Sequence, residues 1–324
     1  MTPEPKSAPL LPQRYGEELF WPALPVKEWE ATRATLHMWT QMAGKVRLAL
    51  TPLVNHWWNV PLYVNSRGLT TSAIPYGKGA FEIQFDFLRH VLEIQTCDAQ
   101  TREIALKPRS VADFYREFMN ALASLDIRVK IWPMPVEIPN PIRLDQDTVH
   151  ASYDPEYANR FWRALVSTDA VLQEFRACFI GKVCPVHFFW GSFDLVVTRF
   201  SGRRAPERPG ADLITREAYS HEVSSVGFWP GNEGVIDAAF YAYAAPEPAG
   251  FKQATVRPAA AYYGPEQSEF FLPYEDVRKS ASPHDALLDF CVSTYDAAAS
   301  LGNWDRAALE RPVQVHRISP AQSN

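Results

Sequence analysis

The amino-acid sequence predicts an α+β protein with mainly antiparallel sheet, built from two similar halves that each run helix, strands, helix. Cap residues mark the helices, alternation of apolar and polar residues marks the strands, and the same order of segments occurs twice. The turns between strands are too short for helical crossovers, which favours antiparallel pairing. We expect the halves to pack about a pseudo-twofold axis and to enclose a shared cleft.

Four helices are predicted from start and stop signals. Ser110, Asp154 and Ser282 are N-cap residues, and proline follows the last two at the first helical position, where its missing N–H is harmless. Apolar residues then recur every three to four positions. The predicted helices are 29–43 ended by Gly44, 111–125, 155–180 ended by Gly181, and 283–301 ended by Gly302.

The strands are predicted from a period of two. Phe81, Ile83, Phe85 and Phe87 alternate with polar residues, which is typical of a strand with one face in a core and one in water. Gly, Pro and Asn turns separate the other segments of this kind. These further strands are predicted over 91–96, 101–106, 129–132, 186–200, 219–226, 240–243 and 254–262.

Short matches at corresponding places suggest an internal duplication. The matching pairs are Phe20-Trp21 with Phe161-Trp162, Gly-Lys-Val at 44–46 and 181–183, His56-Trp57-Trp58 with His187-Phe188-Phe189, and Ala-Ser-Leu at 123–125 and 299–301. Two unrelated runs of helix, strands and helix are the alternative.

The domain boundaries follow from a Pro-rich passage. Four prolines between 133 and 141 remove backbone donors and forbid a helix, which predicts an extended connector. We divide the chain into a flexible segment 1–19, a first half 20–132, a connector 133–150, and a second half 151–324 with its C-terminal tail.

The composition indicates a globular protein. The chain has 324 residues, 47% of them hydrophobic and 21% charged, so it can bury a sizeable core. Lys and Arg number 32 against 37 Asp and Glu, and the net charge of −5 argues against a nucleic-acid partner. No apolar run approaches the roughly 18 residues of a membrane span, and the first thirteen residues lack the apolar core of a signal peptide.

Cysteine usage favours a reducing compartment. Cys97, Cys178, Cys184 and Cys291 show neither C-x-x-C spacing nor the density of a secreted scaffold. We expect reduced thiols in a cytoplasmic protein that has no membrane partner.

Four long segments together resemble a known family. They are Trp57–Tyr76, Ile131–Ile138, His150–Pro155 and His187–Arg204, and the similarity runs over nearly all of the chain. The chain resembles a bacterial family described only as a domain of unknown function, number 5996. The resemblance implies a bacterial, cytoplasmic protein and brings no catalytic residues with it.

The segment from His187 to Asp194 is dense in aromatic residues and also carries a histidine, a hydroxyl and a carboxylate. Ligand sites combine apolar walls with a few polar groups, so this segment predicts a pocket with His187 and Trp190 beside the ligand. The alternative is a buried central strand in which His187 binds a main-chain carbonyl.

Further candidate ligand-binding residues lie elsewhere in the chain. His56, Trp57 and Trp58 with Tyr76 are the counterpart in the first half, with core packing as the alternative. Trp229 lies on a predicted turn and suits the rim of a pocket. Arg199, Arg203, Arg204 and Arg208 cluster near a loop and suit an anionic group, with solvated surface charge as the alternative.

His187, His221 and Glu222 are the candidate catalytic residues. Histidine titrates near neutrality and a carboxylate can raise its pKa, so His221 and Glu222 suit an acid and a base. Adjacent strand residues point apart, however, so each needs partners from another strand.

No protein-bound metal is expected. The chain lacks H-E-x-x-H, C-x-x-C and H-x-H spacings. A hairpin centred near Glu207 places Asp194 opposite Ser220 and His187 roughly 20 Å from His221, too far to share an ion. P-loop, Rossmann and G-x-S-x-G patterns are also missing, so the cofactor stays unknown.

Together these residues predict a protein that binds a small molecule in an aromatic cleft, with His187 or His221 as a general base. The alternative is a non-catalytic ligand-binding or protein-interaction module, in which the aromatic residues matter and the histidines do not. The sequence identifies neither the ligand nor the oligomeric state.

Overall fold

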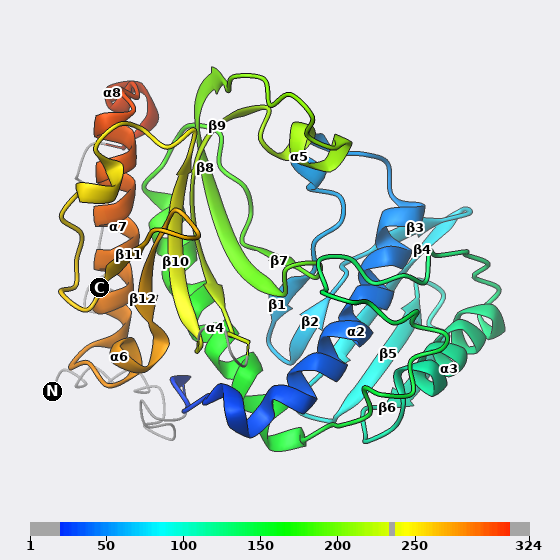
Figure 1. Cartoon of the computed structure of the whole chain (residues 1–324). Coiled ribbons are helices and arrows are strands. Elements are labelled where there is room, and N and C mark those ends of the chain that lie inside the picture. Colours follow the sequence, from blue (N-terminus) through cyan, green and yellow to red (C-terminus); the bar gives the residue numbers. More distant parts are fainter. Residues whose placement is uncertain (1–19, 233–236, 312–324) are drawn as a thin grey trace, which may run out of the picture.

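The structure is a computed structural model that describes residues 20–232 and 237–311. It contains two six-stranded antiparallel sheets with long helices packed against them (Figure 1). The predicted α+β class and antiparallel pairing are therefore confirmed. No helix in the described ranges combines the length and the apolar character that a membrane span requires.

The first sheet and its helices are formed by residues 26–124. The elements are α2 (Val26–Leu50), η1 (Asn55–Trp57), β1 (Tyr63–Asn65), β2 (Gly68–Thr70), β3 (Ile74–Tyr76), β4 (Gly79–Asp86), β5 (Val91–Thr96), β6 (Thr101–Ala105) and α3 (Val111–Ser124). The strands pair in the order β1-β2-β4-β5-β6, and β3 pairs with β4 beyond the end of β2. α2 packs against β3 and α3, and α3 packs against β6.

The second sheet and its helices are formed by residues 155–309. The elements are α4 (Pro155–Ala177), β7 (His187–Phe189), β8 (Asp194–Arg204), α5 (Leu213–Ala218), β9 (His221–Trp229), β10 (Ala239–Ala245), η2 (Phe251–Gln253), β11 (Tyr262–Gly264), β12 (Glu269–Pro273), α6 (Tyr274–Arg278), α7 (Pro283–Leu301) and α8 (Arg306–Leu309). The strands pair in the order β11-β12-β10-β9-β8-β7. α4 and α7 contact each other and cover one face of this sheet (Figure 1).

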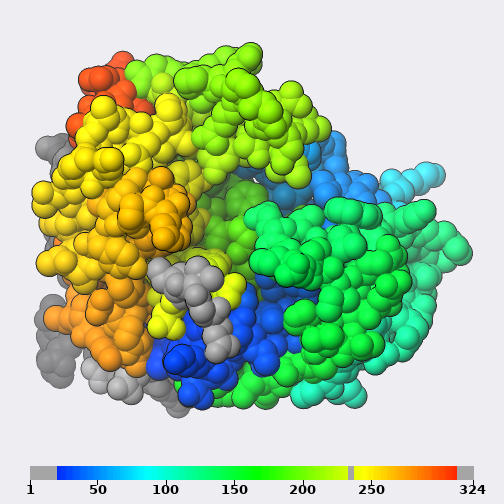
Figure 2. Space-filling model, viewed as in Figure 1, coloured from blue at the N-terminus to red at the C-terminus, as the bar shows by residue number. Residues whose placement is uncertain are grey.

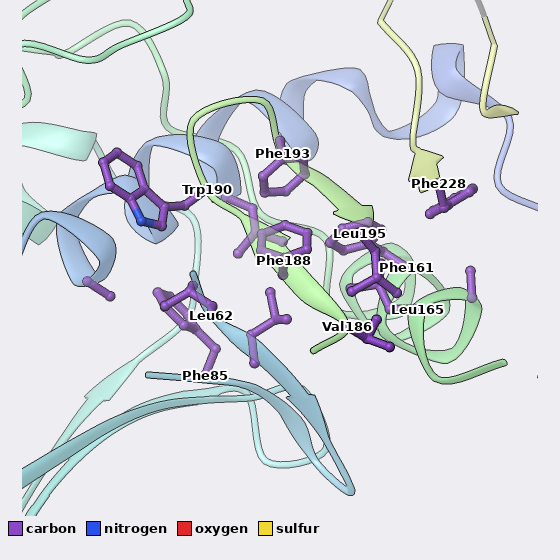
Figure 3. Packing of buried hydrophobic residues seen from close by; sticks show 14 of the residues in the cluster. Leu62, Phe85, Phe161, Leu165, Val186, Phe188, Trp190, Phe193, Leu195 and Phe228 are labelled. Carbon is purple, nitrogen blue, oxygen red and sulfur yellow. The ribbon is translucent and has the colours of Figure 1, made fainter. Parts of the chain in front are cut away.

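The edge strands β1 and β7 join the two halves. Leu62, just before β1, forms an antiparallel bridge with Phe188, and each N–H donates to the other residue's carbonyl at 2.9 Å. Figure 3 shows Phe188 next to Phe161 and Phe193, with Leu62 and Phe85 toward the first sheet. The rings of Phe161 and Phe193 stack with centroids 5.1 Å apart. One hydrophobic core therefore extends through both halves.

The two halves share an order of elements. In each, a long helix leads into a meander and a second helix follows, with β1-β2-β4-β5-β6 matching β7-β8-β9-β10-β12. The short sequence matches do not follow this order, because residues 44–46 lie inside α2 whereas 181–183 come after α4. The Ala-Ser-Leu match lies at the ends of α3 and α7 and does correspond. The pseudo-twofold axis and the duplication stay predictions.

The predicted helix starts are confirmed by their caps. The side chains of Ser110, Asp154 and Ser282 each accept a hydrogen bond from a backbone N–H in the first turn. The predicted end at Gly302 is also correct, since α7 finishes one residue before it.

The predicted helix ends at Gly44 and Gly181 are wrong. α4 stops earlier, at Ala177. α2 continues through Gly44 to Leu50. Position 44 needs a glycine because the indole of Trp190 packs directly on it, and a Cβ there would overlap the ring. Glycine thus marks a close approach rather than a helix end at this position.

Three strand predictions are wrong, and so is one register. The single strand predicted over 186–200 is a hairpin of β7 and β8 with a turn at 190–193. Residues 129–132 form no strand, and of 254–262 Tyr262 alone belongs to one. β8 runs on to Arg204 and pairs it with His221, while Leu195 pairs with Phe228. Asp194 therefore lies near the Trp229 end of β9 instead of opposite Ser220, because the loop with α5 takes up the residues assigned to the hairpin.

Candidate functional site

Three basic side chains meet beside α5. We call His56, Lys182 and His221 the histidine–lysine cluster. His56 comes from η1, Lys182 from the segment after α4, and His221 begins β9. Lys182 Nζ lies 2.6 Å from His56 Nε2, and the ring centroids of the two histidines are 5.5 Å apart. The fold thus gathers two of the predicted histidines with a lysine that the sequence reasoning missed.

The α5 region fixes the ring of His56. His56 and Trp57 have φ values of 57° and 62°, a left-handed conformation that is unfavourable for side chains with a Cβ. The His56 N–H donates to Glu217 Oε1 at 2.9 Å, and the Trp57 indole N–H donates to the Ile214 carbonyl at 3.2 Å. These bonds from α5 hold the strained turn in place.

The hydrogen bonds of the ring define its tautomer. His56 Nδ1 lies 3.0 Å from the carbonyl oxygen of Glu217 and 3.2 Å from that of Ala218. Carbonyl oxygens only accept hydrogen bonds, so Nδ1 carries the proton. Nε2 is then an acceptor, and it faces the Lys182 ammonium.

Aromatic rings and positive charges surround Lys182. Nζ is 5.2 Å from the Trp58 ring centroid and 4.8 Å from that of Phe200. Burial lowers the pKa of Lys182, although the Glu217 carboxylate partly opposes this. Burial and the Lys182 charge lower the pKa of His56, and burial, Lys182 and Arg204 lower that of His221. The cluster therefore presents positive potential with poorly solvated basic groups.

A pocket of about 330 Å³ adjoins the cluster. Arg204, Arg208 and Arg216 line it, together with Tyr219, Ser220 and the other residues of the loop 205–210, of which Glu207 is acidic. We call it the arginine pocket. None of the three guanidinium groups forms an ion pair with a carboxylate of the described residues. Glu207 lines the pocket and Asp212 interacts electrostatically with Arg216, so the three guanidinium groups leave an excess of positive charge that suits an anion.

The arginine pocket and the histidine–lysine cluster are contiguous through His221. Ser220 Oγ lies 3.1 Å from His221 Nδ1, and Arg204 is the cross-strand partner of His221. The Arg208 guanidinium stacks 4.3 Å from the Tyr219 ring centroid. A ligand in the pocket would thus reach a histidine edge and an aromatic surface.

The other two predicted arginines have structural partners. Arg199 is buried, lies 3.5 Å from the Phe175 ring centroid and 4.2 Å from that of Tyr295, and its pKa falls to about 10 because of burial. Arg203 pairs with Glu222 at 2.7 Å and donates to carbonyls after α7. We therefore do not retain Arg199 as a ligand-binding residue or Glu222 as a catalytic residue.

Three tyrosines connect the arginine pocket to a buried carboxylate through hydrogen bonds and one ring contact. The Tyr219 and Tyr243 hydroxyls are 3.1 Å apart, and Tyr243 stacks on Tyr241 with centroids 6.2 Å apart. The Tyr241 hydroxyl and Ser192 Oγ both donate to Asp194. We call these five side chains the acid–tyrosine network. It lies on the face of the second sheet that α4 and α7 leave open.

The open face borders a hollow. Figure 2 shows this hollow between the two halves, with green atoms of the second half on its floor. Glu269 belongs to the same region, because burial and then the Asp194 charge raise the Glu269 pKa to about 7. Burial also raises the pKa of Asp194 itself. The Glu269 carboxyl group is therefore poised to hold a proton near neutral pH.

Glycine permits the central contact of this network. A Cβ at Gly227 would lie 2.5 Å from the Tyr241 hydroxyl, so the missing side chain lets the phenol cross β9 and reach Asp194 on β8.

Replacing Tyr241 with phenylalanine is expected to lower the free energy of unfolding by about 1 to 2 kcal/mol, because Asp194 then loses a buried donor. Urea unfolding followed by tryptophan fluorescence measures the change. Tyr262→Phe is the matched control, since that side chain is 46% exposed and should leave the stability unchanged. Equal stability of Tyr241→Phe and the wild type would show that Asp194 does not depend on this hydrogen bond.

Two predicted site residues are part of the core. His187 is fully buried, and neither ring nitrogen has a hydrogen-bond partner among the described residues. Burial, with help from the Arg47 and Arg176 charges, lowers its pKa to about 3, which is too low for a general base at neutral pH. Trp190 is 6% exposed and donates its indole N–H to the Val60 carbonyl at 2.9 Å. The burial that the alternative predicted is therefore observed, but its other two parts are wrong, because β7 is an edge strand and His187 binds no main-chain carbonyl of the described residues.

The remaining candidates are dispersed. Trp58 contacts both His56 and His187, with centroids 5.5 and 6.0 Å away. Tyr76 lies on β3 and accepts from the Arg128 N–H at 2.8 Å, and Trp229 ends β9. Arg216 was missed because no helix was predicted where α5 carries it. Lys182 belongs to the second Gly-Lys-Val tripeptide, which was interpreted as a sign of internal duplication and not as part of a functional site.

Comparisons with known proteins give a family and no further relative. The model of a family described as "Family of unknown function (DUF5996)" matches residues 21–311. No curated protein and no solved structure matches the chain. Among residues 20–232 and 237–311, no group of three or more His, Cys, Asp or Glu side chains is arranged to hold a metal ion.

Proposed function

Because the chain belongs to the DUF5996 family of unknown function, its site is the guide to its activity, and we propose that it binds a small anionic molecule in the arginine pocket. The ligand would carry a carboxylate or phosphate group. His221 at the edge of the pocket is the group placed to act as a general base, in place of the buried His187.

One observation carries this proposal: three arginines line one pocket without ion-pair partners among the described residues. The whole chain has a net charge of −5, so this local positive charge is not a general property of the surface. Guanidinium groups match carboxylate and phosphate oxygens with paired hydrogen bonds. The volume of about 330 Å³ is at the small end of ligand pockets.

The surroundings support a small organic ligand over a bare ion. Tyr219 offers a ring already stacked with Arg208, and Ser220 offers a hydroxyl. His221 has a lowered pKa, so it is neutral at pH 7 and can accept a proton. A bound anion would raise that pKa and stabilise the protonated form.

Replacing Arg208 or Arg216 with glutamine is expected to weaken anion binding at least about tenfold, which corresponds to about 1.4 kcal/mol for one charge-assisted pair. Isothermal titration calorimetry with inorganic phosphate, and separately with succinate, measures the affinity. Raising the salt concentration should also weaken binding, because the pocket is open to solvent.

Arg160→Gln is the matched control for these variants. Arg160 also stacks on a tyrosine, 5.1 Å from the Tyr157 centroid, but it lies on α4 outside the pocket. It should bind both anions as the wild type does. If neither anion binds, or if all three variants bind equally, the pocket is not an anion site.

A further inference from the structure

We infer that Lys182 is a covalent attachment site, at which the amine forms an imine with the carbonyl group of a small anionic aldehyde or ketone such as a 2-oxo acid. The inference deepens the proposed function, because the arginine pocket would hold the anionic end of the same molecule. It rests on the contacts around Lys182 Nζ.

The first step is the pairing of an amine with a base. A lysine must lose a proton before it can attack a carbonyl carbon. His56 Nε2 is 2.6 Å from Lys182 Nζ and is available to accept that proton, since the Glu217 and Ala218 carbonyls keep the other ring proton on Nδ1. The strained turn at His56, held by the Glu217 carboxylate, fixes the ring in this position.

The second step is the environment of the amine. Lys182 Nζ lies over the rings of Trp58 and Phe200, which contact each other, and it forms no ion pair with a carboxylate of the described part of the chain. His221 and Arg204 add positive charge from β9 and β8, while Glu217 is the acidic group that opposes them. A neutral amine is favoured where solvation is poor and positive charges are close. Such surroundings are typical of lysines that form Schiff bases.

The third step is the position of the substrate. Lys182 is half-buried, so a small molecule can reach it. The Lys182 segment runs beside β8, because the Phe200 N–H donates to the Lys182 carbonyl at 3.0 Å. His221 contacts His56, the partner of Lys182, and also Ser220, which lines the arginine pocket. An anion with a carbonyl a few bonds away could therefore bind the arginines and present its carbonyl to the amine.

The reaction balances without a cofactor. The Lys182 ammonium passes a proton to His56, and the neutral amine adds to the carbonyl carbon, so that a C–N bond forms. The carbonyl oxygen takes up protons, one of them returned by His56, and leaves as water when the C–O bond breaks. The net change converts an ammonium group and a carbonyl into a protonated imine and one water, and nothing is oxidised or reduced.

Borohydride trapping of the full-length protein tests this inference. The protein is incubated with pyruvate at pH 7 and reduced with sodium borohydride, and mass spectrometry then measures the adduct and its position. We expect a single adduct on Lys182. Lys182→Arg should give none while keeping its thermal transition. Adducts spread over surface lysines, or equal labelling of the Lys182→Arg variant, would overturn the inference.

Two further variants separate reactivity from folding. Lys45 is a buried lysine on α2 whose pKa burial lowers to about 8, but no histidine of the described residues is bound to it, so Lys45→Arg should label as the wild type does. His56→Gln should slow trapping roughly 100-fold at pH 7, the usual contribution of a positioned base, and should recover at pH 10. A rate unchanged in His56→Gln at pH 7 would contradict the role of the histidine.

The lysine and arginine variants, measured in both assays, distinguish the anion pocket from the covalent step. If Lys182→Arg still binds succinate and the wild type gives no adduct, the anion pocket stands and the covalent step fails. If the wild type is trapped on Lys182 but Arg208→Gln and Arg216→Gln react as fast as it does, the lysine is reactive and the arginine pocket does not hold the substrate.

Discussion

Replacing Gly44 with alanine is expected to lower the free energy of unfolding by at least about 2 kcal/mol, within the range of overpacked cores. In an exposed helix the same change would stabilise by about 1 kcal/mol. Gly44 lies in the interior of α2 and is buried, and a Cβ there would overlap the Trp190 indole. The indole cannot easily move away, because it is buried and its N–H donates a hydrogen bond to the Val60 carbonyl. Chemical denaturation with tryptophan fluorescence measures the loss.

A double-mutant cycle identifies the cause. In a Trp190→Leu background the ring is gone, so Gly44→Ala should be neutral or slightly stabilising. The two changes should therefore couple by more than about 1 kcal/mol. If alanine destabilises equally in both backgrounds, the effect comes from the helix backbone and the packing argument fails.

The fold was predictable from sequence wherever the signal is local. Ser110, Asp154 and Ser282 accept bonds from N–H groups within three residues, so their role can be read without knowing the partner element. The alternation in β4 is local as well. The wrong helix end at Gly44 has another origin. That glycine is required by its contact with Trp190, a residue nearly 150 positions away. Close approach between distant segments leaves no local pattern.

The candidate site shows the same limit. Sequence reasoning singled out His56, Trp58 and His221, and the structure places all three together. It could not find Lys182, whose importance depends on a contact with His56 across 126 positions. Arg216 was missed because the loop between β8 and β9 contains α5, a six-residue helix without an apolar stripe. Short helices of that kind depend on tertiary contacts more than on propensity.

Four of the histidines differ in what surrounds them. His221 is partly exposed and His56 is buried, and both lie with Lys182 in the histidine–lysine cluster. His37 and His187 are buried, and burial lowers their pKa values to about 4 and about 3. The first pair suits chemistry. The second pair lowers the free energy of unfolding in acid, because the buried imidazoles stay neutral in the fold.

Replacing His187 with leucine is expected to make the protein about 3 kcal/mol less sensitive to a change from pH 7 to pH 4.5. The pKa of this group is 6.5 in the unfolded chain and about 3 in the fold. Above pH 6.5 both states are neutral, and the group adds no pH dependence. Between pH 6.5 and about 3 the unfolded chain binds a proton that the fold does not, so the wild type loses stability as the pH falls, by about 1.4 kcal/mol per unit.

Urea unfolding of both proteins at the two pH values measures this difference, and comparing the proteins cancels every group they share. Leucine is similar in size and removes two buried nitrogens that have no partner among the described residues, so the stability at pH 7 should be equal or higher. Glu269→Gln provides a control of opposite sign. The Glu269 pKa is raised to about 7 in the fold, so protonation of this group increases the free energy of unfolding as the pH falls toward 4.5. Its replacement should therefore make the protein more sensitive to acid. If wild type and His187→Leu lose equal stability between pH 7 and 4.5, His187 is not the neutral core residue that its burial implies.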